Sequence, residues 1–89
     1  MPKAEIRWKR ETREGVRLQV YAQHVGRDWR FYAREKRFDN WEAIPDPPLE
    51  DWLELLDAIQ RRITRRLARP EEEDRVKASI RQRFPDANL

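Results

Sequence analysis

Two runs of alternating apolar and polar residues, separated by a glycine turn, most constrain what this chain can fold into. They cover residues 16–23 and 29–34. Because successive side chains of a strand point to opposite faces, a period of two predicts antiparallel strands with one buried face. The buried face is expected to hold Val16, Leu18, Val20, Trp29, Phe31 and Ala33. The other face is expected to carry Arg17, Gln19, Tyr21, Gln23, Arg30, Tyr32 and Arg34.

The first half of the chain is expected to form four strands. Residues 5–9 alternate and form the first strand. Residues 16–25 and 29–36 extend the two runs into a second and a third strand, and Gly26 closes the hairpin between them. A turn follows, and residues 41–44 form a short fourth strand. The pattern predicts an antiparallel meander.

The second half is expected to form two helices. Asp46-Pro47-Pro48 marks the start of the first, because an Asp side chain can cap free amides and Pro is tolerated in the first turn. Apolar spacing predicts a long helix over about residues 47–69, and after Pro70 a shorter one over about residues 71–84. The predicted fold is α+β: one domain of residues 1–89, with a four-stranded antiparallel β-meander packed on one long helix and a shorter C-terminal helix.

The composition argues against several classes of function. The 89 residues include no Cys, one His and two Gly. No disulfide framework is possible, and no nucleophile–base set, metal-ligand spacing or phosphate-binding glycine loop can be drawn. We therefore expect no enzyme activity, catalytic residue, cofactor, metal or small-molecule substrate. No segment has the apolar length of a membrane span or a secretory signal, so a cytoplasmic protein without a membrane partner is expected.

The charge is high but nearly balanced. There are 20 basic and 17 acidic residues, a net charge of +3, and 16 of the basic residues are Arg. Arg suits bidentate contacts to phosphate, but a GC-rich genome gives the same bias. The balance fits a protein-interaction module as well as a nucleic-acid-binding one.

The polar strand face is the best functional candidate. Tyr21 and Tyr32 could stack on unpaired bases, while Arg17, Arg30 and Arg34 neutralise phosphates. The alternative is an ordinary solvent-exposed sheet face, where Tyr and Arg are common cross-strand neighbours.

An arginine run follows the apolar stripe of the long helix and consists of Arg61, Arg62, Arg65, Arg66 and Arg69. At helical spacing it could grip a nucleic-acid backbone or an anionic lipid surface. The alternative is that it complements the helix dipole and forms i, i+4 pairs such as Asp57 with Arg61.

The apolar stripe itself is wider than one sheet face can cover, which suggests self-association. The expected dimer contacts are Trp52, Leu55, Leu56 and Ile59. Alternatively, the second helix covers the stripe through Val76, Ile80 and Phe84.

Two segments of the chain carry a resemblance to a known family. The first is His24-Val25-Gly26-Arg27, leading to Phe31-Tyr32-Ala33-Arg34-Glu35, and the second runs from Ile44-Pro45 through Trp52, Leu55, Leu56 and Ile59. The first is similar to the glycine-basic hairpin and the strand ending in Arg-Glu of the small transcriptional positive-cofactor family of single-stranded-DNA-binding proteins, which belongs to the wider whirly-like group. The second is similar to the start of the helix in that family. The chain departs from the family at Asp39-Asn40-Trp41-Glu42, where the family has a basic segment with glycine.

The resemblance implies a homodimer built partly through the long helix, with single-stranded nucleic acid lying across the sheet face opposite that helix. Carried over by position, it implies contacts from Arg27 and Arg34, with Arg30 and Tyr32 as neighbours.

The sequence therefore predicts a non-enzymatic module that binds single-stranded DNA or RNA as a homodimer. One rival is an interaction or assembly module that uses the apolar helix stripe. Another inserts the sheet into the major groove of a duplex, where the strand-face side chains read base edges.

Overall fold

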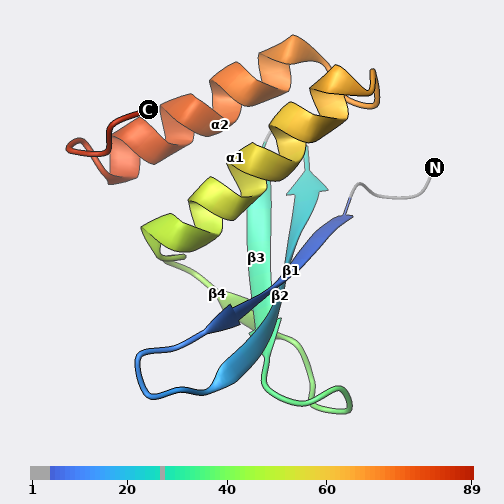
Figure 1. Ribbon diagram of the computed structural model, residues 1–89, viewed down its shortest axis with the longest axis vertical. Coiled ribbons are helices and arrows are strands. Elements are labelled where there is room, and N and C mark those ends of the chain that lie inside the picture. The colour runs from blue at the N-terminus through green and yellow to red at the C-terminus, as the bar shows by residue number, and fades with distance from the viewer. Residues whose placement is uncertain (1–4, 27) are drawn as a thin grey trace. The chain divides into compact units, whose positions relative to one another are not determined.

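The computed structural model describes residues 5–26 and 28–89. Its elements are β1 (Glu5–Glu11), β2 (Arg17–Val25), β3 (Asp28–Arg34), β4 (Glu42–Ile44), α1 (Leu49–Thr64) and α2 (Pro70–Arg83). The predicted α+β class is confirmed: a four-stranded antiparallel meander is followed by two helices (Figure 1). The chain divides into two compact units, a sheet unit of Met1–Pro47 and a helical unit of Pro48–Leu89.

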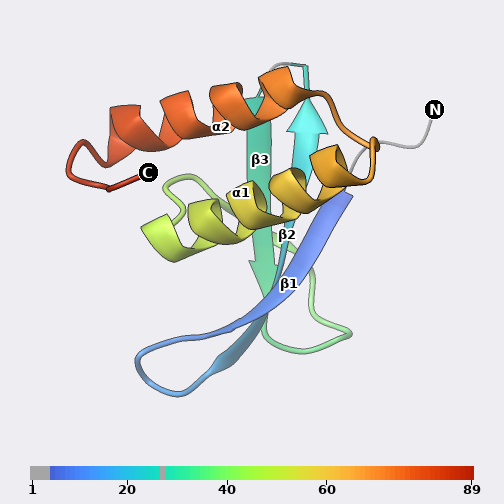
Figure 2. The ribbon, with the colours of Figure 1, turned by 45° about the horizontal axis from the view of Figure 1, so that its top comes forward.

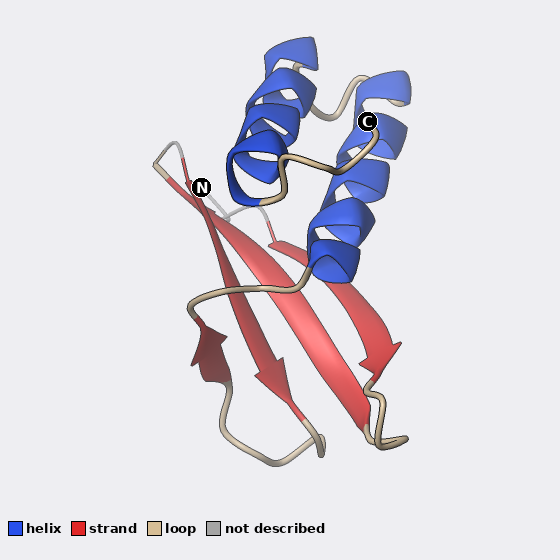
Figure 3. Cartoon of the chain, turned by 90° about the vertical axis from the view of Figure 1, so that its left-hand side faces the viewer, coloured by secondary structure: helices blue, strands red, loops and turns tan. Residues whose placement is uncertain are grey.

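The strands of the sheet unit lie side by side in chain order, each antiparallel to the next (Figure 3). Tyr21 pairs with Tyr32 and Val20 with Ala33. Residues paired in an antiparallel ladder share a face, so this register confirms both predicted faces. Ile6, Val20, Ala22 and Phe31 are buried on the apolar face.

Glycine is required in both tight connections of this sheet. Gly15 has φ 81° in the β1–β2 connection and Gly26 has φ 63° after β2. These left-handed conformations cost glycine little, because it has no Cβ. Thr12 stabilises the first connection: its amide donates to the Val16 carbonyl (2.8 Å) and its hydroxyl accepts from the Val16 amide (3.1 Å).

Helix α1 begins differently from the prediction. Its first residue is Leu49, Pro48 occupies the N-cap position, and no side chain caps the helix. The predicted cap by Asp46 is wrong. A capping side chain must stand at the N-cap to reach the first free amides of the helix, and Asp46 lies two residues before that position. Glu50 and Asp51 in the first turn have the charge that the helix dipole favours.

Helix α1 also ends earlier than predicted, at Thr64 rather than near residue 69. Arg66 has φ 61°. Its amide donates to the Ile63 carbonyl (2.9 Å), and the Leu67 amide donates to the Arg62 carbonyl (2.7 Å). These two bonds form a Schellman motif with Arg66 at the position that glycine usually takes. Arg65, Arg66 and Arg69 of the arginine run consequently lie in the connection between the helices, not on α1.

Helices α1 and α2 pack side by side in the helical unit (Figure 2). The Glu73 carboxylate of α2 pairs with Lys77 (3.0 Å) and accepts a hydrogen bond from Gln60 of α1. The Lys77 hydrogen bond is the main reason that the pKa of Glu73 lies below its usual value. Val76 and Ile80 of α2 are buried and Phe84 is half-buried; these are the three residues named in the alternative that the second helix covers the apolar stripe. No helix in the described part of the chain has the length and apolar character needed to cross a membrane.

Candidate functional site

The structure brings the predicted binding residues together on one surface, here called the polar face. It is the side of the sheet that carries Tyr21 of β2 and Tyr32 of β3. The register places Arg34 beside Gln19, Arg30 beside Gln23, and Arg17 opposite Glu11 of β1. Arg17 and Arg30 are exposed, while Arg34 is half-buried. The predicted Arg27 lies outside the described residues.

Three aromatic rings meet on the polar face. Tyr21 and Tyr32 are stacked, with ring centroids 4.8 Å apart and an interplanar angle of 18°. The rings of Trp41 and Tyr21 form a T-shaped pair, with centroids 4.6 Å apart and an interplanar angle of 90°. Sequence reasoning assigned Trp41 to the fourth strand and missed its place in this aromatic cluster. Extending the β3–β4 register by one residue puts Trp41 opposite Arg34, but that register is visible only in the folded sheet.

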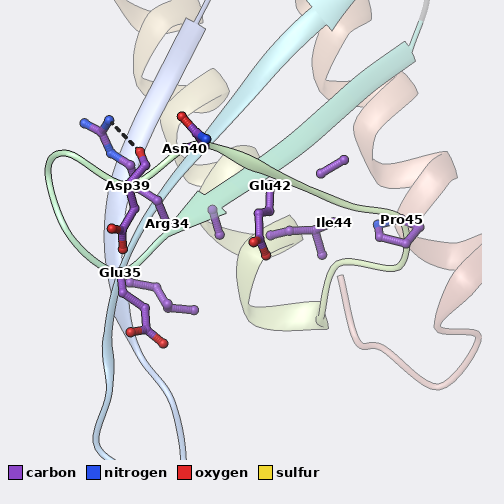
Figure 4. Close-up of a pocket in the computed structure, with 10 residues that line it drawn as sticks. Arg34, Glu35, Asp39, Asn40, Glu42, Ile44 and Pro45 are labelled. Atoms are coloured by element: carbon purple, nitrogen blue, oxygen red, sulfur yellow. Dashed lines mark hydrogen bonds between the residues drawn. The ribbon is translucent and has the colours of Figure 1, made fainter.

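Arg34 organises this part of the face. Its Nε–H donates to Gln19 Oε1 (2.8 Å), and its Nη1–H donates to the Asp39 carbonyl (3.5 Å; Figure 4). Its guanidinium carbon lies 4.1 Å from the centroid of the Trp41 ring, a cation–π distance. These contacts leave part of its N–H fork for a ligand, since an Arg has five donors. Arg34 thus holds Trp41 in position and can also contact a ligand through its remaining N–H groups.

Beside the aromatic cluster is a hollow of about 330 Å³, here called the basic depression. Four cationic residues line it: Arg7, Lys9, Arg34 and Arg37. Its other described lining residues are Trp8, Gln19, Val20 and Trp41, and none of the described lining residues is acidic. Sequence reasoning missed Arg7, Lys9 and Arg37. The alternation of β1 carries a signal for Arg7 and Lys9, but Arg37 lies in a loop with no such pattern.

Another cavity of the sheet unit, of about 560 Å³, has the opposite electrostatic character. Its lining includes the carboxylates of Glu35, Asp39 and Glu42 and one cation, Arg34 (Figure 4). The excess of carboxylates disfavours an anionic ligand there. Among the described residues no group of potential ligands could hold a metal ion.

The burial of the aromatic cluster changes the chemistry of Tyr21. Desolvation raises the pKa of its hydroxyl above the usual value, and the neighbouring Tyr32 and Glu5 raise it further against an opposing effect of Arg7. The Tyr21 hydroxyl therefore loses its proton at a higher pH than the hydroxyl of an exposed tyrosine.

The residues predicted to form a dimer are buried. Trp52, Leu55, Leu56 and Ile59 all lie in the buried part of α1, and the guanidinium of Arg83 covers the Trp52 ring at 4.9 Å. A dimer that used them would have to replace contacts they already make. Dimerisation stays a prediction.

Comparison with known proteins does not add to these observations. The chain matches no protein-family model, no curated protein and no solved structure. The resemblance to the single-stranded-DNA-binding positive-cofactor family therefore depends on the residues quoted for it alone.

Proposed function

We propose that the polar face binds nucleic acid, with single strands bound in preference to duplexes. The observation that carries this proposal is the aromatic cluster of Tyr21, Tyr32 and Trp41 next to a depression lined by four cations and by no described carboxylate. Nucleic acid combines flat apolar bases with a regularly charged backbone, so its binding proteins pair stacking rings with Arg and Lys.

The proposed mechanism divides the work between the two kinds of side chain. Unpaired bases stack on the aromatic cluster, while the exposed Arg17 and Arg30 and the cations of the depression neutralise phosphates. Single strands are favoured because the bases of a duplex are already stacked on one another and offer only their edges. This mechanism includes no chemical reaction, so the protein is proposed to be a binding module and not an enzyme.

Fluorescence anisotropy with a labelled single strand and a duplex of the same sequence, at low and near-physiological salt, tests this function. The variant Tyr21→Ala/Tyr32→Ala is expected to weaken single-strand binding by about 1–3 kcal/mol per stacked base. Tyr21→Phe/Tyr32→Phe is the matched control, because it keeps both rings and should bind nearly as well as the wild type. Circular dichroism establishes that both variants are folded.

Three other results would contradict the proposal in whole or in part. Preference for the duplex would favour insertion of the sheet into the major groove. Unchanged affinity of the Ala variant would remove the stacking mechanism. No binding to either oligonucleotide at low salt would overturn the proposed function and leave an interaction module as the better explanation.

A further inference from the structure

We infer that the basic depression is a subsite for one phosphate group of the bound strand, with the adjoining nucleobase seated against Trp41. This inference deepens the proposed function and rests on it. It assigns a ligand group to Arg7, Lys9 and Arg37, none of which the sequence patterns marked as binding residues.

The polar groups of the depression select for a group rich in acceptors. Arg7, Lys9 and Arg37 carry only donors, and Arg34 brings donors that its described contacts leave unused. Gln19 Oε1, the acceptor of the one lining amide side chain, is occupied by Arg34 Nε. A phosphate diester or monoester, which is anionic and presents several acceptor oxygens, satisfies such a set.

The Arg7 side chain is available despite its neighbour Glu5. Their ion pair is long, at 3.4 Å, and the Arg7 side chain is 67% exposed. Exposed pairs of this kind contribute little to stability, so a phosphate can compete for the guanidinium at small cost.

The aromatic wall indicates that the phosphate belongs to a nucleotide and not to a simple anion. Trp41 lines the depression together with the cations. Arg34 holds the indole through its cation–π contact and is itself fixed by Gln19. A ring held in place before binding loses little freedom when a base stacks on it, whereas inorganic phosphate would leave that surface unused. The volume of about 330 Å³ is at the low end of the range for small-ligand pockets, which suits one nucleotide unit.

A matched pair of double variants tests the subsite. Lys9→Gln/Arg37→Gln removes two exposed cations of the depression, and Arg13→Gln/Arg81→Gln removes two exposed cations elsewhere with the same change in net charge. Anisotropy with a labelled thymidine oligonucleotide should show about tenfold weaker binding for the first variant, the decrease expected for one charge-assisted hydrogen bond. The slope of log affinity against log salt should become shallower by roughly 0.7 for each phosphate that the variant no longer neutralises. The control should change neither quantity as much.

Trp41 supplies a second readout that removal of charge would not produce. Trp41→Leu should weaken binding and leave the salt slope unchanged, while Trp41→Phe should retain most of the affinity, because stacking needs a ring and involves no counterion. A further experiment adds a 5′-phosphate to the oligonucleotide and shows whether the subsite binds a terminal or an internal phosphate. Tighter binding that disappears in Lys9→Gln/Arg37→Gln assigns the subsite to a terminal phosphate, and no change assigns it to an internal one.

The failure of this inference differs from the failure of the proposed function. Equal decreases in affinity of the two double variants would overturn the subsite, because net charge would then explain both. If the tyrosine variant loses affinity while Lys9→Gln/Arg37→Gln binds like the wild type, the proposed function stands and the subsite falls. A wild-type protein that binds no single strand removes both.

Discussion

Arg34 illustrates how one residue can serve as support and as ligand group on the same face. The sequence places it among the phosphate contacts, yet in the structure its guanidinium lies over Trp41 and its Nε–H is bonded to Gln19. A lysine would keep the charge and lose the planar fork and the stacking surface. The identity of the cation therefore matters more here than at the exposed Arg17 or Arg30.

We predict that Arg34→Lys destabilises the protein by about 1–2 kcal/mol, the sum of one cation–π contact and one hydrogen bond. Urea unfolding followed by tryptophan fluorescence measures this decrease in stability. Arg30→Lys is the control, because Arg30 is exposed and has no contact of this type among the described residues. Equal stability of the two variants would show that the Arg34 contacts contribute nothing.

Tyr21 gives a prediction for alkaline pH. Because burial raises the pKa of Tyr21 in the folded protein, the folded state holds this proton more tightly than the unfolded state. The stabilisation is fully present below the unfolded pKa of about 10 and is lost as pH rises through the higher folded pKa. Tyr21→Phe should therefore lose less stability than the wild type when urea unfolding is repeated at increasing pH above about 10. Parallel decreases in the two proteins would contradict the raised pKa.

At the scale of elements, the end of α1 depends on a strained residue. The Schellman motif holds Arg66 at φ 61°, whereas the preceding Arg65 has φ −88°. A non-glycine residue in the left-handed region costs roughly 1–2 kcal/mol. The helical spacing of the arginine run predicts one continuous helix. The helix nevertheless ends at Thr64, because Arg66 takes the left-handed position of the Schellman motif. Since that position usually holds glycine, the sequence pattern gives no sign of the helix end.

Arg66→Gly is expected to stabilise the protein by up to about 1 kcal/mol, since the relief of strain exceeds the entropy that glycine adds to the unfolded chain. Arg65→Gly, at a residue with ordinary φ, is expected to destabilise it by up to about 1 kcal/mol. Urea unfolding of both variants measures these opposite signs. Two destabilised variants would mean that the motif tolerates Arg66 without strain.

At the scale of the whole molecule, the positions of the charged residues affect the affinity for nucleic acid more than the net charge does. A net charge of +3 predicts weak attraction to nucleic acid, but four of the cations line one depression on the polar face without a described carboxylate. If these four cations bind one phosphate together and the exposed Arg17 and Arg30 each neutralise another, log affinity for a single strand should fall against log salt with a slope of about −2, at roughly −0.7 for each neutralised phosphate. Anisotropy titrations at several salt concentrations measure the slope. A slope near zero would indicate that the cations take no part in binding.

The same scale applies to the predicted homodimer. Leu55 is buried in α1, so Leu55→Ala is expected to cost about 2–5 kcal/mol of stability through the cavity it leaves.

Thermal unfolding of the wild type at increasing protein concentration tests the association itself, because the midpoint of a dimer that dissociates on unfolding rises with concentration. A midpoint independent of concentration would contradict the dimer.

Local pattern was enough to determine the order of the elements and the side of the sheet on which each strand residue lies. The period of two separates Tyr21 and Tyr32 from Val20 and Phe31, and a helical period marks Leu55 and Ile59 as buried. These features follow from geometry that each strand or helix has on its own. The tertiary structure decided which residues meet: pairing of β1 with β2 brings Arg7 and Lys9 beside Tyr21 and Gln19, and the β3–β4 turn returns Trp41 to Arg34. Such contacts join residues of different segments, and no periodicity within one segment specifies them.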